Sequence, residues 1–197
     1  MKSIGFSEMT FLIKSDYFRY WRDDPFYAHF KEFLFRPGFK YSFWMRVCAY
    51  TKRKWPLLPV FIVAKFILLH YQAKYGIEIS ESMPVGGGLY IAHPGCIVVN
   101  PRAVIGRNCN ISHGVTIGES KRGENKGNPV IGDNVYFAPG AKVFGKIKIG
   151  NNVAIGANCV VNTDIPDNAV VVGIPGKVVS YDGAEGYLYN NDYAILP

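Results

Sequence analysis

The sequence has no block of like charges and no unbroken apolar run long enough to cross a membrane. Lys and Arg outnumber Asp and Glu by 22 to 15, but the excess is spread along the chain, so we expect no nucleic-acid partner. The most apolar stretch, residues 57–70, is interrupted by Pro59 and Lys65 and is too short to span a bilayer. We therefore expect no integral membrane segment and interpret this stretch as a buried helix. Basic residues 52–54, just before it, leave a membrane-surface role as the weaker alternative.

Cysteine is scarce and carries no pattern. The four cysteines, Cys48, Cys96, Cys109 and Cys159, show neither a CxxC pair nor the spacing of metal ligands. The first residues lack a basic start followed by an apolar run and a small-residue cleavage site. We therefore expect a cytoplasmic protein with free thiols and no bound metal.

Amino-acid composition and residue spacing divide the chain into two unlike parts and a tail. Residues 1–75 hold most of the aromatic residues and few glycines, and apolar residues such as Phe43, Val47 and Tyr50 recur at helical spacing. From Gly76 onward, glycine, valine, isoleucine and asparagine dominate. We predict an N-terminal helical domain over residues 1–75, a β-domain over 76–180 and a C-terminal tail over 181–197.

The β-domain repeats every six residues. An inward anchor, branched aliphatic or aromatic, recurs with this period, often followed by glycine; the anchors are Val85, Ile91, Ile97, Ile105, Ile111, Ile117, Ile131, Phe137, Val143, Ile149, Ile155 and Val161. Two steps are longer: eight residues between Ile97 and Ile105, and fourteen between Ile117 and Ile131. A β-sandwich has variable turns and would not keep such a register. The pattern predicts a parallel β-helix whose three-sided coils stack to bury the anchors.

This register places two histidines together. His93 and His113 each lie two residues after an anchor, and the three-sided count puts them on one side of neighbouring coils. Pro139 and Ala157 continue that column on the next coils. Imidazole is the natural base for a hydroxyl near neutral pH, and small residues below it leave room for a long, narrow ligand. We interpret His29 and His70, which lie in the helical part, as structural.

The fourteen-residue step contains a polar, glycine-rich loop, residues 118–129. An excursion from a solenoid corner often borders a binding face. Its cations Lys121, Arg122 and Lys126 fit either phosphate contacts or a solvated surface.

These features together resemble a known family. The repeats, the segment His113-Gly-Val-Thr-Ile-Gly118 and the closing segment Ile165–Lys177 look like the hexapeptide acyltransferases, nearest to serine O-acetyltransferases and their relatives in bacterial polysaccharide gene clusters. Residues 16–25 also resemble the helical domain of that branch. The resemblance implies an α+β fold with a left-handed parallel β-helix. It also implies acetyl-CoA as acetyl donor and a homotrimer with active sites between subunits, and it leaves open whether two trimers pair.

The resemblance also implies roles for single residues. His93 matches the family's catalytic base, and Glu78 matches the carboxylate that orients this base, with Glu in place of the usual Asp. His113 is a second substrate-binding group or the base itself. Asp16 matches an acidic residue that holds the ammonium group of serine. The positions that match the coenzyme A channel are Gly118, Pro139 and Ala157, and Lys177 is a candidate contact for a coenzyme phosphate.

One departure from the family pattern concerns the acceptor. The serine enzymes carry an Arg-His pair before the proline that ends the long loop, where this chain has Gly127 and Asn128 before Pro129. Asn128 stays a candidate acceptor contact, but the loss of the pair weakens the case for serine. We therefore expect an acetyl-CoA-dependent O-acetyltransferase that acts on a sugar hydroxyl in polysaccharide biosynthesis, with serine as the alternative acceptor.

Two other classes of function share this fold. A zinc carbonic anhydrase needs three histidine ligands, and this register aligns two. In a non-catalytic trimeric scaffold, the β-helix would only assemble and the helical part would bind a partner. Binding of coenzyme A separates that scaffold from an enzyme.

Overall fold

The structure is a computed structural model that describes residues 4–22 and 36–193. The helical part comprises α1 (Phe6–Trp21), α3 (Pro37–Thr51), the short 3-10 helix η2 (Trp55–Leu57) and α4 (Leu58–Tyr75). Prolines lie in the first turns of α3, η2 and α4, where a missing N–H costs nothing. Gly76 ends α4 in the left-handed conformation with φ 60°. His29 lies outside the described residues.

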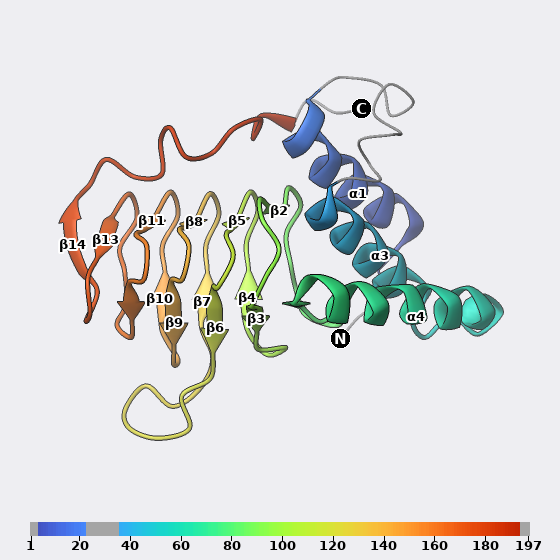
Figure 1. The fold of residues 1–197 in the computed structure, drawn as a ribbon, viewed down its shortest axis with the longest axis horizontal. Coiled ribbons are helices and arrows are strands. Elements are labelled where there is room, and N and C mark those ends of the chain that lie inside the picture. The colour runs from blue at the N-terminus through green and yellow to red at the C-terminus, as the bar shows by residue number, and fades with distance from the viewer. Residues whose placement is uncertain (1–3, 23–35, 194–197) are drawn as a thin grey trace.

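The rest of the chain is a solenoid of short strands (Figure 1). The strands are β1 (Ile77–Glu78), β2 (Tyr90–Ile91), β3 (Ile97–Val99), β4 (Val104–Ile105), β5 (Asn110–Ile111), β6 (Thr116–Gly118), β7 (Val130–Ile131), β8 (Tyr136–Phe137), β9 (Lys142–Phe144), β10 (Lys148–Ile149), β11 (Ala154–Ile155), β12 (Val160–Val161), β13 (Val170–Val172) and β14 (Lys177–Ser180).

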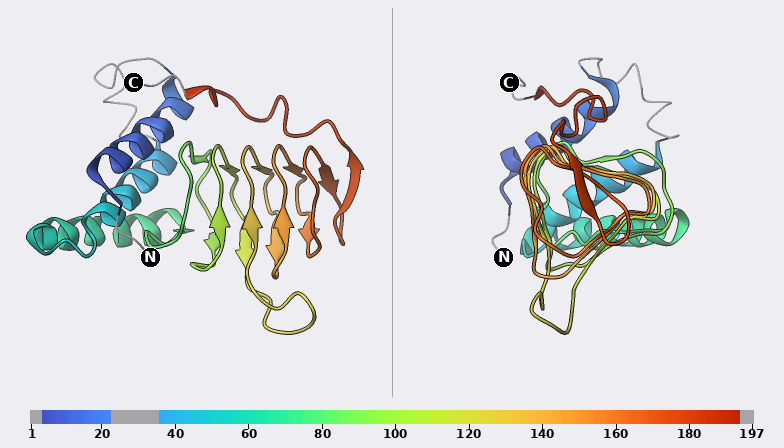
Figure 2. Two further views of the ribbon diagram at one scale, coloured as in Figure 1. Left: turned by 180° about the vertical axis from the view of Figure 1, so that it is seen from behind. Right: turned by 90° about the vertical axis from the view of Figure 1, so that its left-hand side faces the viewer.

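The strands form three sheets that close a triangular coil, which Figure 2 shows end-on. Sheet A has the order β1-β3-β6-β9-β12, sheet B has β10-β7-β4, and sheet C has β14-β13-β11-β8-β5-β2. All pairs are parallel except β13–β14. The predicted parallel β-helix is confirmed.

The register corrects the predicted position of the eight-residue step. Val99, and not Ile97, pairs with Ile117, while Ile91 pairs with Ile111 as expected. The two extra residues therefore lie in the corner between β2 and β3, residues 92–96, and not after Ile97. This corner contains His93. The sequence alone does not show which of Ile97 and Val99 is the anchor that pairs with Ile117, because both side chains are apolar and both are buried.

The glycines that follow the anchors of sheet B are explained by the spacing between coils. A Cβ on Gly106 would meet the carbonyl oxygen of Gly132 at 2.4 Å, and one on Gly132 would meet that of Gly150 at 2.7 Å. Backbones of adjacent coils approach too closely here for any side chain. The glycines thus satisfy a packing requirement between coils.

Helix α4 is more exposed than the sequence predicted. Of its residues, Ala64 and Leu68 are the ones that are buried, against α3 and the start of the solenoid. The helical segment Trp55–Tyr75 is, by length and composition, long and apolar enough to cross a membrane, and only 11% of its most apolar part is buried. The prediction of a buried helix is therefore wrong for the described chain, whereas the length criterion is met only by the longer helix of which residues 57–70 are a part. His70 is exposed, beside Tyr71.

The described part of the tail, residues 181–193, returns along the outside of sheet C to the helical part (Figure 1). The backbone N–H of Gly183 donates to the carbonyl of Asn168, and the Tyr187 ring stacks on Tyr136 at 4.7 Å. At the far end, the buried Tyr193 donates to the carbonyl of Gly87 at 2.8 Å. The tail thus packs against its own solenoid.

Candidate active site

Two imidazoles meet at the corner between sheets C and A. His93 follows β2 and His113 follows β5, and the in-register pairing of these strands brings their ring centroids to 6.3 Å. The rings are inclined at 67°, edge to face. Both side chains are exposed. The predicted juxtaposition of the two histidines is therefore present in the structure.

Small residues continue the same corner on later coils. Backbone hydrogen bonds from Gly140 to the His113 carbonyl and from Asn158 to the Pro139 carbonyl align His113, Pro139 and Ala157 in one column. Gly173 stands two residues after Val171, which pairs with Ile155, and extends the column to the last coil. Below the histidines, no side chain of this column is large enough to block an extended ligand.

The sequence analysis did not identify one cation that lies beside this column. Lys142 lies in β9, where it pairs with Thr116 of β6. Its Nζ donates to the carbonyl of Gly114, next to His113, and to Thr116 Oγ1 at 3.2 Å. The signal was available in the register, since Lys142 occupies an outward position of sheet A one coil beyond Thr116. This half-buried ammonium group makes the wall below the histidines attractive to an anion.

Glu78 is less closely tied to the site. It is exposed, on the outer face of β1, and pairs with Val98 of β3. In the part of the chain that the structure describes, no hydrogen bond or ion pair joins Glu78 to His93. Its orienting role stays a prediction.

Asp16 is buried in the interface between the helices and the solenoid. Its carboxylate accepts hydrogen bonds from Arg46 Nε at 3.0 Å and Nη2 at 3.2 Å, and from the Leu89 backbone N–H at 2.8 Å. Arg46 also donates to the carbonyls of Val85 and Gly86, both at 2.7 Å. Burial raises the pKa of the Asp16 carboxyl, and the Arg46 guanidinium opposes that rise. These contacts attach α1 and α3 to the first coil and leave Asp16 inaccessible to an acceptor.

The long loop leaves a different corner from the histidines. The loop begins after Gly118, the last residue of β6. This residue lies at the edge of sheet A opposite the histidine corner, and Figure 2 shows the loop projecting from the solenoid. A bridge between Ser120 and Gly127 closes it, with N–H to carbonyl distances of 3.0 and 2.9 Å. The buried Oδ1 of Asn128 has no hydrogen-bond partner among the described residues. Gly118 and Asn128 therefore stand apart from His93 within one protomer.

Lys177 lies at the far end of the solenoid. It begins β14, directly after the turn of residues 173–176, and its side chain is exposed. This turn closes the column at the end opposite the histidines. A contact between Lys177 and a coenzyme phosphate stays a prediction.

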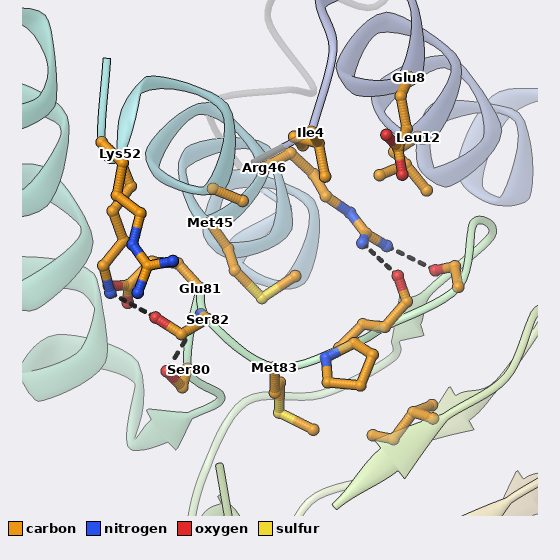
Figure 3. Close-up of a pocket in the computed structure, with 16 residues that line it drawn as sticks. Ile4, Glu8, Leu12, Met45, Arg46, Lys52, Ser80, Glu81, Ser82 and Met83 are labelled. Carbon is orange, nitrogen blue, oxygen red and sulfur yellow. Dashed lines mark hydrogen bonds and ion pairs between the residues drawn. The ribbon is translucent and has the colours of Figure 1, made fainter. Parts of the chain in front are cut away.

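A cavity of about 530 Å³ lies elsewhere, between the helices and the first coil (Figure 3). Met45 and Arg46 of α3, Glu8 and Leu12 of α1, and the strand-free segment 80–86 are among its lining. The Arg46 guanidinium donates hydrogen bonds to the carbonyls of Val85 and Gly86, which also line the cavity. The cavity is lined by neither histidine of the column.

Within residues 4–22 and 36–193, no three His, Cys, Asp or Glu side chains gather in a way that would hold a metal ion.

Comparison with known proteins connects this geometry to a family. Residues 128–163 match the family model described as bacterial transferase hexapeptide (six repeats). A serine acetyltransferase from Staphylococcus xylosus is 36% identical over 174 residues, which cover 87% of this chain and 78% of the relative. The chain belongs to the serine acetyltransferase family. The match includes the helical part as well as the repeats.

Other members differ in how much of them the chain covers. Serine acetyltransferase from Staphylococcus aureus strain Mu50 is 47% identical over 108 residues, which are 55% of this chain and 51% of the relative. The chain thus spans about half the length of the curated relatives that it matches with highest identity. The crystal structure of a serine acetyltransferase from Brucella abortus strain S19, in complex with coenzyme A, superimposes with a TM-score of 0.73 at 25% identity, covering 89% of this chain and 69% of that one.

Membership in the serine acetyltransferase family confirms the predicted fold class, a left-handed parallel β-helix with an N-terminal helical domain. It also confirms the resemblance to hexapeptide acyltransferases of the serine O-acetyltransferase branch.

Proposed function

We propose that this protein transfers an acetyl group from acetyl-CoA to an acceptor hydroxyl. The observation that carries the proposal is the pair of imidazoles, 6.3 Å apart, at the head of a column of small residues in a member of the serine acetyltransferase family. Imidazole can take a hydroxyl proton near neutral pH, and the column leaves space for the pantetheine arm. Acetyl-CoA serves as donor, and no metal takes part in the proposed reaction.

His93 acts as the general base in this proposal. Its ring removes the proton from the acceptor hydroxyl, whose oxygen attacks the thioester carbonyl carbon. The carbon–sulfur bond then breaks, and the departing thiolate takes back the proton from the imidazolium. His113 holds the acceptor or stabilises the tetrahedral oxyanion by donating a hydrogen bond. Glu78 would orient His93 and stabilise the imidazolium.

The wall below the histidines would hold the coenzyme. Pro139 and Ala157 leave room for the pantetheine arm, while Lys142 and Lys177 supply positive charge toward the phosphates. Lys142 lies in β9 of sheet A, bound to the Gly114 carbonyl beside the column, and Lys177 begins β14, after the turn that closes the column. Lysine binds phosphate as a point charge and needs no fixed geometry.

The site needs a second protomer. In one chain the histidines and the long loop lie at opposite edges of sheet A, and the histidines face solvent. In a homotrimer, the loop of one solenoid would approach the histidine corner of the next and bring Gly118 and Asn128 to the site. The unpaired Oδ1 of Asn128 could then accept a hydrogen bond from the neighbour or its acceptor. Pairing of two trimers stays a prediction.

Serine is the acceptor that the comparisons favour. The relatives described above are serine acetyltransferases, so serine takes precedence over the sugar hydroxyl that the sequence analysis placed first. The reaction would take place in the cytoplasm, where serine is available.

A sugar hydroxyl is the second candidate, and two observations favour it. Asp16, the expected ammonium contact, is buried against Arg46. In addition, Gly127 and Asn128 replace the Arg-His pair expected for binding the serine carboxylate. Both departures concern recognition of the amino acid and leave the acetyl-transfer machinery intact.

The test offers acetyl-CoA and single acceptors to the purified full chain and follows the free thiol of coenzyme A. Serine and a panel of nucleotide sugars and oligosaccharides are compared at equal concentration. Turnover with serine supports the first proposal, and turnover with a sugar alone supports the second. Failure to bind coenzyme A in calorimetry would contradict both and leave the non-catalytic scaffold.

A further inference from the structure

The cavity between the helices and the first coil has the size of a ligand site. Its volume of about 530 Å³ lies within the range typical of small-molecule sites, whereas few voids in a protein interior exceed a water molecule. Helix α1 contributes Leu12 to the lining, α3 contributes Met45 and Ala49, and the strand-free segment 80–86 contributes Met83 (Figure 3). The cavity therefore lies at the junction where the helical part meets the solenoid.

Much of the cavity wall is apolar and adaptable. Met45 and Met83 line it from α3 and from the segment before β2, and both are buried. The thioether is polarisable and its unbranched chain changes rotamer readily, so two methionines can adjust to flat or branched apolar groups. Leu12, Val85 and Ile105 add aliphatic surface. Such a wall binds a ligand through contact area and sets no strict outline for it.

The buried ionised groups of the wall are already matched within the chain. The Arg46 guanidinium binds the Asp16 carboxylate, and the Glu81 carboxylate binds the ammonium groups of two lysines at 2.9 and 2.8 Å. Glu8 and Arg53, which also belong to the lining, are exposed and stay in contact with water. An ion brought into the buried part would lose its hydration without gaining an unpaired counter-charge. The ligand that suits this wall is therefore uncharged.

The wall also contains a buried hydrogen-bond donor that is not used. Arginine has five N–H groups, and four of those of Arg46 are engaged: Nε and Nη2 donate to Asp16, Nη1 to the Val85 carbonyl, and Nη2 also to the Gly86 carbonyl. Among the described residues, the second N–H of Nη1 has no acceptor, although the side chain is only 4% exposed. A buried donor without a partner costs free energy, and an oxygen atom of a ligand would recover it.

We propose that this cavity binds an uncharged, largely apolar small molecule that carries a carbonyl or similar acceptor oxygen. The apolar body lies between Met45 and Met83, and the oxygen accepts the remaining Nη1 hydrogen of Arg46. Because such a ligand contacts both the helices and residues 80–86, its binding stabilises the junction between the helical part and the solenoid. Neither histidine lines the cavity, so the proposal does not depend on the proposed acetyl transfer.

The experiment compares three probes by equilibrium dialysis against the full chain. 1-Acetylnaphthalene is uncharged and carries a carbonyl, 1-ethylnaphthalene lacks the oxygen, and 1-naphthoate carries a negative charge. We expect 1-acetylnaphthalene to bind with a dissociation constant of about 1 mM or tighter and to raise the melting temperature. Loss of the oxygen should weaken binding about five- to tenfold, because the Arg46 donor stays unpaired. Naphthoate should bind about tenfold more weakly or worse, because its charge loses hydration.

A pair of variants locates the bound probe. Ala49 lies in α3, half-buried in the lining, so the ring of Ala49→Phe would occupy part of the cavity and should weaken 1-acetylnaphthalene binding about tenfold or more. The matched control is Ala73→Phe, at an exposed position of α4 outside the lining, and it should bind like the unaltered chain. If Ala49→Phe melts lower, the order of the three probes on the unaltered chain decides the proposal.

Four results would overturn the proposal. They are absence of 1-acetylnaphthalene binding, equal or tighter binding of naphthoate, equal binding of 1-ethylnaphthalene, and unaltered binding by a stably folded Ala49→Phe. In the last case, displacement of the probe by coenzyme A would place it in the column of small residues instead. A fall in oligomeric mass in Ala49→Phe but not in Ala73→Phe would also overturn the proposal, since a second copy of the chain would then fill the cavity. Probe binding without coenzyme A binding would leave this proposal standing while the acetyl transfer fails.

Discussion

The ion pair between Asp16 and Arg46 allows a structural role to be separated from a substrate-binding role. Both side chains are almost completely buried, and Arg46 also satisfies the carbonyls of Val85 and Gly86. The change Asp16→Asn keeps the size of the side chain but leaves the guanidinium without its counter-charge. Arginine cannot lose its proton in response, so the variant must keep a buried, unpaired cation.

The expected cost follows from that geometry. Removing one partner of a buried ion pair costs about 3–5 kcal/mol. The amide can still accept hydrogen bonds from Arg46 and from the Leu89 N–H, so we expect the lower end, about 3 kcal/mol. For a chain of this size, that lowers the melting temperature by about 6–12 °C.

The assay combines thermal unfolding with acceptor kinetics. Melting is followed at one fixed protein concentration, because assembly shifts apparent stability. The control is Asp192→Asn, which removes the exposed pair with Arg22 at 3.4 Å and should cost less than about 1 kcal/mol. Kinetics are measured well below the melting temperature, where KM for serine should stay within about twofold of the unaltered value, because Asp16 is inaccessible to serine.

The opposite pattern would refute the reasoning. If Asp16→Asn melted like the unaltered protein while KM for serine rose about tenfold or more, Asp16 would contact the substrate. The buried arrangement would then not describe the working enzyme.

Three further predictions concern other parts of the molecule. His93→Ala should lower kcat by about 10²–10⁴-fold with coenzyme A binding intact by calorimetry; if activity survives, His113→Ala should show the loss instead. Partial burial favours a raised pKa for Glu81, but Lys65 and Lys52 outweigh it and hold the pKa at about 2. Because the folded pKa lies below the ordinary 4.5, this stabilisation is complete above about pH 4.5 and is lost as the pH falls toward 2. Solvent around the two partly exposed lysines screens it to about 1–2 kcal/mol. Acid unfolding of Glu81→Gln should lack that component, and an unchanged acid profile would count against the assignment. Gly106→Ala should destabilise by about 1–3 kcal/mol in urea unfolding, since its Cβ would meet a backbone oxygen that cannot move aside; unaltered stability would show that the coils can separate.

The sequence predicts the solenoid well because its signal is local and repeated. Each anchor indicates the same six-residue period as its neighbours, so one ambiguous step does not change the predicted fold. Ambiguity remained where Ile97 and Val99 both face the core, and the position of the extra residues could be decided only by the pairing of Val99 with Ile117. The alignment of His93 with His113 was predictable, because both are counted from unambiguous anchors, Ile91 and Ile111.

Other features depend on contacts between distant segments, which periodicity does not encode. The sequence identifies Asp16 as the match to an acidic position of the family. Its burial, however, depends on its ion pair with Arg46, which lies thirty positions away in the sequence. The exposure of α4 depends on which of its sides packs on α3, and a helix that is apolar all round gives no indication of this. Lys142 could have been found from the register, because it follows Thr116 by one coil.

The path of the tail changes how this solenoid holds together. Coils of a repeat protein normally contact their nearest neighbours, so an end can fray without disturbing the rest. Here Gly183 binds Asn168 near the last coils, and Tyr193 binds Gly87 on the first. Residues 181–193 therefore link the last coils of the solenoid to the first, and opening one end disturbs contacts made at the other. The first coil thus gains its contact with Tyr193 only after the whole solenoid has been synthesised.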